Sequence, residues 1–263
     1  MKLFVLTVMK KCFAIIITAS FVLPFFGYGQ IDIKSKLDQA QKLEDQNKPI
    51  EALTIYKDII KADSSQAYAL CKTSAIMAKE GPFLKSIKNK EQWYRQALYL
   101  AEKGTRINPK LPEAHFTIAF ACARLTDYAG VNEKVKLSIK MKSEAEKAVA
   151  LKPTLAEAYF ILGKWHQVMA GFNALEMVMI KAIYSNMPEG SYQSALDNLN
   201  KAIKFNQSAL LYYYELANTY YLRDDDGDVD KAKAIISRIE KTPPKNEEDK
   251  GVLVQVKELK NKL

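Results

Sequence analysis

Residues 112–125 read PEAHFTIAFACARL. Near the middle of this stretch, Ala119 has at −4, −1 and +3 the neighbours His115, Ile118 and Cys122. Residues with this spacing lie on one stripe of an α-helix. The stretch therefore predicts a helix that presents a small residue at a contact with another helix. Two helices cross closely only where one of them offers no bulky side chain.

The same pattern occurs five times, with the small residue at Ala40, Ser74, Ala119, Gly163 and Ala217. A second helical stripe follows each copy, and these second stripes end at Ser64, Pro109, Pro153, Gln207 and Pro244, which are 45, 44, 54 and 37 residues apart. This arrangement resembles tetratricopeptide repeats, whose unit is 34 residues, with extra residues inserted in four of the five copies. We therefore expect an all-α helical-repeat superhelix of about five helix pairs.

The fourth pair is unusual because 32 residues separate Gly163 from Ala195, where an uninterrupted repeat has twelve. The added Met- and Ile-rich segment, 168–184, predicts one extra inserted helix. We interpret it as a core helix that covers one edge of the array, in preference to a membrane-binding or partner-binding helix. Residues 247–263 carry apolar residues on one face and predict a C-terminal capping helix that shields the last apolar surface.

The first 29 residues predict a secretory signal peptide. Lysines precede an apolar run over 12–27, and Gly27 and Gly29 supply the small residues that a signal peptidase requires before Gln30. The run has sixteen residues, whereas a membrane-spanning helix needs about 20, so a retained anchor is the weaker interpretation. We expect an exported protein, periplasmic or secreted, with no integral membrane segment after cleavage and one repeat domain over 30–263.

The charge and the cysteines exclude some classes of function. The formal charge of +9 falls to +6 without the signal peptide, which carries three lysines and no acid, and it is spread over Lys/Glu-rich helix faces. Arg is scarce, so no nucleic-acid partner is expected. Cys71 and Cys122 fall on apolar or groove-facing sides of helices. The sequence favours buried free thiols there and leaves a disulfide open.

No pattern in the sequence points to catalysis, a cofactor or a metal. The two histidines, His115 and His166, occupy helix-stripe positions and are interpreted as packing residues. The acidic run 224–230 falls short of a calcium loop, because Leu222 and Lys233 stand where ligands are required. We expect an exposed turn there, in which an Asp caps the next helix, and we expect a non-enzymatic protein.

A more specific resemblance begins at Leu162-Gly163-Lys164-Trp165 and continues through Ala170-Gly171, Leu175-Glu176, Lys181 to Tyr184, Pro188, Ser191-Tyr192 and Ala195-Leu196. Over roughly 90–245 the chain resembles the regulator of microtubule dynamics family. That family has a Gly-Arg-Trp helix, an inserted helix, a double-proline turn and a Thr-Tyr-x-x-Ala-Leu helix. Here Lys164 replaces the Arg and only one proline is present. The resemblance implies the fold and the inserted helix. Because the signal peptide is of bacterial type, tubulin is not expected as a partner.

In tetratricopeptide proteins the first helix of each pair lines a concave groove. The face beside the small-residue stripe selects as groove residues Tyr68, Phe116, Phe120, Phe160, Lys164, Tyr214, Asn218 and Tyr221. Exposed aromatics at equivalent places suggest anchors for a protein or peptide partner. The sequence leaves open that another segment of the chain fills the groove. The alternative function is a small-molecule or lipid binder with an apolar pocket beneath the Met-rich inserted helix.

The exported protein is expected to begin at Gln30. Intact-mass measurement of the protein purified from its native source checks this expectation. A mature form that keeps residues 12–27 and is recovered only with membranes would contradict it.

Overall fold

The structure is a computed structural model that describes residues 32–85, 89–185 and 187–263. Residues Asp32–Leu263 form one compact unit, and within the described part of the chain there are helices and no strands. The expected signal peptide and its cleavage site before Gln30 lie outside the described residues.

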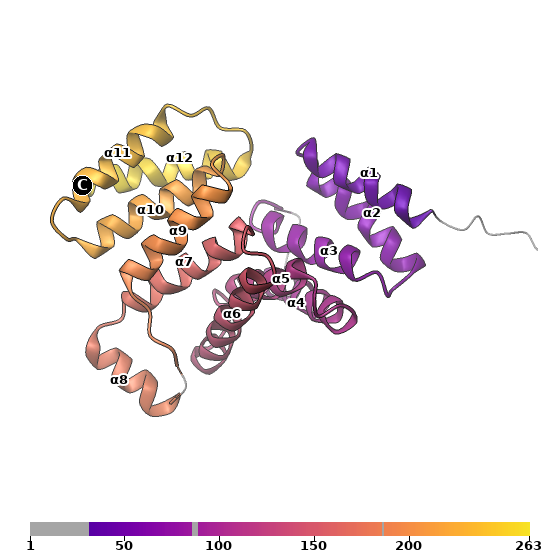
Figure 1. The fold of residues 1–263 in the computed structure, drawn as a ribbon, viewed down its shortest axis with the longest axis horizontal. Helices are drawn as coiled ribbons and strands as arrows, with labels where there is room; N and C mark the ends of the chain where they lie inside the picture. The colour runs from indigo at the N-terminus through magenta and orange to yellow at the C-terminus, as the bar shows by residue number, and fades with distance from the viewer. Residues whose placement is uncertain (1–31, 86–88, 186) are drawn as a thin grey trace, which may run out of the picture. The chain divides into compact units, whose positions relative to one another are not determined.

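Twelve helices are described (Figure 1): α1 (Ile33–Asp45), α2 (Pro49–Ala62), α3 (Ala67–Glu80), α4 (Lys90–Ile107), α5 (Pro112–Leu125), α6 (Val131–Leu151), α7 (Ala156–Ala170), α8 (Ala174–Ile183), α9 (Tyr192–Phe205), α10 (Leu210–Arg223), α11 (Asp228–Glu240) and α12 (Glu247–Lys260). All five predicted pairs, the extra helix and the C-terminal helix are present. The all-α fold class is therefore confirmed. The predicted extra helix began too early, because Val168 belongs to α7.

Local chemistry explains many of the helix boundaries. Pro49 and Pro112 stand at the first positions of α2 and α5, where the missing N–H of proline costs no hydrogen bond. The side chains of Asn89, Ser191 and Asn246 accept a hydrogen bond from a backbone N–H in the first turn of α4, α9 and α12, respectively. Each such cap satisfies an N–H that has no partner inside the helix.

Apart from α8, each helix packs on the next one along the array, with α7 on α9, and the first helices of successive pairs also meet: α3 contacts α5, α5 contacts α7, and α7 contacts α10. These four helices form one continuous surface, which is the side on which a groove was predicted. At its C-terminal end α12 packs on both α10 and α11. The capping helix was therefore correctly predicted.

The close crossings depend on the small residues. Ala40, Ser74, Ala119 and Ala217 have no solvent-exposed surface. The crossing of α7 on α9 is very close, because a Cβ added at Gly163 would lie 2.7 Å from Cγ of Leu199. Real Cβ atoms do not approach other carbon atoms so closely, so only glycine fits this crossing without a shift of the Leu199 side chain or of the helices.

The interpretation of α8 as a core helix is wrong. None of its residues is buried, and the outward side chains of Leu175 and Ile183 are 70% and 73% exposed. Only the inward side of α8, through Met177 and Ile180, packs on a cluster that contains Trp165. Apolar spacing in a sequence shows that a helix has an apolar face, but it does not show what covers that face.

The cysteines and one histidine have clear structural roles. Cys71 and Cys122 are buried free thiols, and burial raises the pKa of each to about 12, so neither is a reactive thiolate at neutral pH. The interpretation of His115 as a packing residue was incomplete. Its Nδ1 lies 2.6 Å from Oε2 of Glu144 and its Nε2 lies 2.8 Å from the carbonyl oxygen of Pro109. The ring thus links α5 to α6 and to the turn before α5.

Gly163→Ala is expected to destabilise the array, because the added methyl group overpacks the crossing against Leu199. The loss should be about 1–2 kcal/mol even after the gain in helix propensity. The matched control is Gly251→Ala on α12, where an added Cβ meets no atom within 4 Å, and which should stabilise by about 0.5–1 kcal/mol. Thermal and urea unfolding measure both. Equal effects in the two variants would contradict the role of Gly163.

Candidate binding groove

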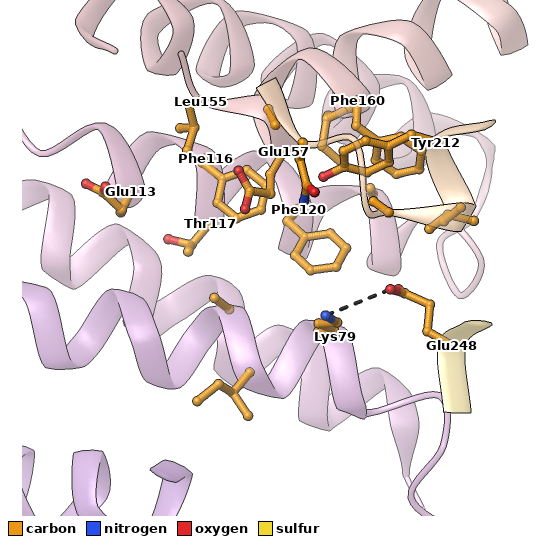
Figure 2. A pocket seen from close by; sticks show the side chains of 18 of the residues that line it. Lys79, Glu113, Phe116, Thr117, Phe120, Leu155, Glu157, Phe160, Tyr212 and Glu248 are labelled. Atoms are coloured by element: carbon orange, nitrogen blue, oxygen red, sulfur yellow. Dashed lines mark ion pairs between the residues drawn. The ribbon is translucent and has the colours of Figure 1, made fainter. Parts of the chain in front are cut away.

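A cavity of about 910 Å³ runs along the surface formed by the first helices of the pairs. Its lining extends from Glu44 on α1 through α3, α5 and α7 to Leu211 on α10 and Glu248 on α12. The cavity exists because the first helices contact one another along the array and leave their outer faces free between the two ends. Figure 2 shows its central part.

Two aromatic pairs line the centre of the cavity. Phe116 and Phe120 lie one turn apart on α5, with their rings stacked at 5.6 Å between centroids. Phe160 of α7 stacks on Tyr212 of α10 at 4.7 Å. The three phenylalanines are only partly buried, so apolar ring surface remains open to the cavity. Figure 2 shows Phe120 between the α3 side and the Phe160–Tyr212 pair.

Most basic residues of the cavity wall are already paired with carboxylates. The Nζ–O distances are 2.9 Å for Lys72–Glu44, 3.1 Å for Lys152–Glu113, 2.6 Å for Lys164–Glu215 and 3.8 Å for Lys79–Glu248. The first and third pairs are the more buried ones. Charges that are held in this way confer selectivity on a groove more than affinity, because a ligand gains little from a group that is already neutralised.

One ion pair crosses the cavity. Lys79 on α3 and Glu248 on α12 reach toward each other from opposite sides, as the dashed line in Figure 2 marks. The neighbouring Glu80 is partly buried, and this burial, with a smaller contribution from Glu248, raises the pKa of its carboxyl group, while Lys79 opposes the rise. The pair joins the second helix pair to the C-terminal cap across the groove.

A buried polar network closes the base of the groove between α7 and α10. Glu215 is 8% exposed and accepts from Lys164 at 2.6 Å. The amide nitrogen of Gln167 donates to the hydroxyl of Thr219 at 2.7 Å, and Lys164 also donates to Gln167 at 2.7 Å. Because each buried polar group has a partner, this network fixes how α7 and α10 pack.

The eight residues predicted for the groove divide into two sets. The structure brings five of them to the cavity wall: Tyr68, Phe116, Phe120, Phe160 and Lys164. The other three, Tyr214, Asn218 and Tyr221, do not line it. Tyr214 and Tyr221 pack instead on the apolar cluster that α10, α11 and α12 share. The reason is that α12 lies against α10, so the chain itself occupies the last part of the predicted groove.

Among the cavity-wall residues that sequence reasoning missed are Arg124 and Tyr212. Arg124 follows Phe120 by four residues, so the helical period alone places both on one face. Its guanidinium lies 5.1 Å from the Phe120 ring centroid, and its Nε donates to the carbonyl oxygen of Ala78 at 2.9 Å. Tyr212 had no such signal, because its approach to Phe160 depends on the angle between α7 and α10.

The alternative pocket beneath α8 is filled by packing. Met169 and Met187 are 3% and 5% exposed and form a cluster with Trp165, against which Met177 packs. Neither the groove cavity nor a second cavity, of about 260 Å³ beside Arg238, has a wall residue from α8. The geometry therefore favours the groove over a pocket under the inserted helix.

The acidic run after α10 is joined to neighbouring basic side chains by ion pairs. Among the described residues no group of three His, Cys, Asp or Glu side chains is arranged to hold a metal ion. Asp224 to Gly227 form the predicted exposed turn, but Asp228 has no exposed surface. It accepts hydrogen bonds from Arg223 at 2.7 and 2.8 Å and from Lys231 at 3.0 Å. In place of the expected helix cap, Asp228 forms ion pairs that join α10 to α11.

A family profile with the description "Regulator of microtubule dynamics protein 1-3" matches residues 34–263. The chain belongs to this family. The match extends well beyond the segment, about 90–245, in which the sequence alone showed the resemblance. The whole array, with α1, α2 and the capping helix, is thus part of the family's domain.

Among curated relatives, regulator of microtubule dynamics protein 3 of Xenopus laevis is 30% identical over 102 residues, which are 39% of this chain and 22% of the relative. Protein 2 of Bos taurus is 22% identical over 178 residues, 68% of this chain and 43% of the relative. The aligned segments thus span less than half the length of these relatives.

The solved structure of a thermophilic tetratricopeptide repeat (TPR) protein from Thermus thermophilus matches with a TM-score of 0.58 at 16% identity. The match covers 86% of this chain and 97% of that one. The TPR-like fold predicted from the spacing of small residues is thereby confirmed. None of the helices in the described ranges is both long and apolar enough to span a bilayer.

Asp228→Ala is expected to destabilise the protein by about 2–3 kcal/mol at neutral pH, because it removes the charged acceptor of Arg223 and Lys231. The hydrogen bonds from Arg223 hold the pKa of Asp228 below its ordinary value near 3.9, with further contributions from Lys231 and the Asp225 N–H. The stabilisation is therefore complete above pH 5 or so and is lost as the pH falls below about 4.

Urea unfolding of wild type and variant between neutral and acidic pH measures this effect, and the two stabilities should converge as the pH falls. The control is Asp225→Ala, whose side chain is 66% exposed and which should change stability by less than about 0.5 kcal/mol. A larger effect at Asp225, or stabilisation of the wild type by calcium, would contradict this assignment.

Proposed function

We propose that this chain is a non-enzymatic scaffold that binds a segment of a partner protein, or a peptide, in the groove. One observation carries the proposal: the cavity of about 910 Å³ stays open between α3, α5 and α7 and presents partly exposed phenylalanine rings along its length. An open aromatic surface costs solubility unless a partner covers it. A TPR-like fold is a protein-interaction scaffold, and this groove is its free face.

The chemistry of the wall favours a peptide over a purely apolar ligand. Arg124, Glu80 and Glu157 line the cavity without an ion pair within the described part of the chain, so one positive and two negative charges there are not neutralised by the protein. A peptide supplies carbonyl and carboxylate acceptors, N–H donors and apolar side chains to match this mixed wall. The phenylalanines would act as the anchors and the charges as the selectors.

The same wall supports a non-catalytic role. The described residues that line the cavity include no His and no Cys, and the ring of His115 is turned to Glu144 and Pro109. A nucleophile beside a general base is the arrangement that most hydrolytic and transfer reactions require. The proposal therefore contains no reaction step and no cofactor.

The cellular setting is also a proposal. The apolar run 12–27 and the small residues before Gln30 support export to the periplasm or the outside of the cell. The named relatives are regulators of microtubule dynamics, in Xenopus laevis and Bos taurus. We do not extend that activity to this chain, because the proposed export would separate it from tubulin.

A photo-crosslinking amino acid at position 120 should capture the partner in the native host, whereas the same group at Tyr99 should not. Tyr99 is 57% exposed on α4 and does not line the cavity. Mass spectrometry of the crosslinked product identifies the partner, and a crosslinked lipid or metabolite would instead support the small-molecule alternative.

Phe120→Ala with Phe160→Ala should weaken binding of the captured partner by about 2 kcal/mol or more, close to thirtyfold, because both rings lose their contact with it. Isothermal calorimetry gives the affinity, with Tyr99→Ala as the control and circular dichroism as the check on folding. Should the double variant unfold, the rings are core residues. Unchanged binding by a folded variant would move the site out of the groove.

A further inference from the structure

Helix α8 is apolar on both of its sides. Met177 and Ile180 face inward onto the Trp165 cluster. The exposed apolar side chains of α8, of the end of α7 and of the turn between them are Val168 (57% exposed), Phe172 (39%), Leu175 (70%), Val178 (64%), Met179 (61%) and Ile183 (73%). A helix that is apolar all round is normally covered all round, in a core or by lipid. In Figure 1 α8 projects from the array beyond α7 and α9.

The few polar groups of α8 are already satisfied. The carboxylate of Glu176 accepts the backbone N–H of Asn173 at 2.9 Å, and the Asn173 side chain accepts the N–H of Glu176 at 2.9 Å in return. Lys181 is paired with Glu189. The exposed surface of α8 is therefore mainly hydrophobic, and Glu176, which has no ion pair among the described residues, is its one unneutralised charge.

The rim beside this surface is basic. The Tyr184 hydroxyl donates to Asn132 at 2.6 Å, which places the start of α6 next to the end of α8. There Val131 is 78% exposed, and Lys134 and Lys136 are exposed without an ion pair among the described residues.

The neighbouring acid does not neutralise this rim. Glu133 lies between the apolar Val131 and the two lysines, but the guanidinium of Arg95 binds it through two hydrogen bonds of 2.7 and 3.0 Å. Arg95 also binds Glu91, so these three side chains carry a net charge of −1 against the +2 of the two lysines, and the rim keeps a net positive charge toward an anionic partner.

We propose that the outer face of α8, with Val131, Lys134 and Lys136 at its rim, docks onto an anionic lipid bilayer. A helix of ten residues is about 15 Å long, half of the hydrocarbon thickness, so it would lie in the headgroup region with its apolar side chains inserted. A second copy of this chain brings the same two lysines and a single carboxylate, Glu176, on α8, which already accepts the Asn173 N–H, whereas anionic headgroups supply negative charge for both lysines. No residue of this face lines the groove cavity, so the proposal is independent of the proposed function.

The experiment follows insertion at one position of the full chain, so that any membrane affinity of its N-terminal segment is common to all variants. Val178→Trp is compared with Val254→Trp on α12, an exposed valine of similar accessibility (64% and 58%) that is not on this face. Vesicles contain phosphatidylcholine and phosphatidylglycerol, with brominated acyl chains as the quencher of tryptophan fluorescence. Quenching is expected for Val178→Trp and not for Val254→Trp.

The rim is tested in the same assay. Lys134→Ala with Lys136→Ala should weaken the vesicle affinity measured through Val178→Trp by about fivefold for each lysine, and added salt or pure phosphatidylcholine should weaken it as well. The control is Lys61→Ala with Lys233→Ala, two exposed lysines elsewhere on the array.

Three results would overturn the proposal. They are equal quenching of the two tryptophan variants, no quenching of Val178→Trp, and quenching that does not depend on phosphatidylglycerol. Sedimentation equilibrium tests the other candidate occupant, a second copy of this chain. A dimer that Leu175→Ser abolishes, together with no quenching of Val178→Trp, would assign the face to that second copy.

Discussion

The close approach of paired helices is the constraint on which the rest of this array depends. Ala40, Ser74, Ala119 and Ala217 are fully buried, and at Gly163 there is no room even for a methyl group beside Leu199. Because the two helices of each pair lie close together where they cross, the first helix of one pair can contact the first helix of the next pair. The groove is a consequence of that line of helices, since their outer faces have no further helix to cover them between α3 and α7.

The sequence was sufficient to predict the fold because the fold is local. Each crossing is specified by residues within one pair, and prolines, capping side chains and glycines mark the ends of the helices. The five pairs and the terminal cap therefore follow from spacing alone. Contacts between residues far apart in the chain do not follow from it. The stacking of Phe160 on Tyr212 and the network of Lys164 with Glu215 depend on how α7 meets α10.

The two errors at the candidate sites have one physical origin. Tyr214 and Tyr221 carry the same helical pattern as Phe116 and Phe120, but α12 folds back on them through a turn that no periodicity specifies. The outward apolar side chains of α8 carry the pattern of a core helix, yet nothing in the described part of the chain covers them. A helical period reports that a face is apolar, and only the tertiary structure shows whether the chain, a partner or the solvent meets it.

The groove and α8 differ in how they can recognise a partner. In the groove most lysines are neutralised by the protein itself, so free aromatic surface supplies affinity, and a partner that leaves Arg124 or Glu157 unpaired and desolvated is penalised. Around α8 the exposed apolar side chains do not discriminate between partners, and the nearby lysines have no ion pair among the described residues. These features suit binding to a membrane surface, which presents charge and no specific sequence. The two faces share no residue. If both proposals hold, such a scaffold would keep a partner in the groove while α8 holds the complex at a membrane surface.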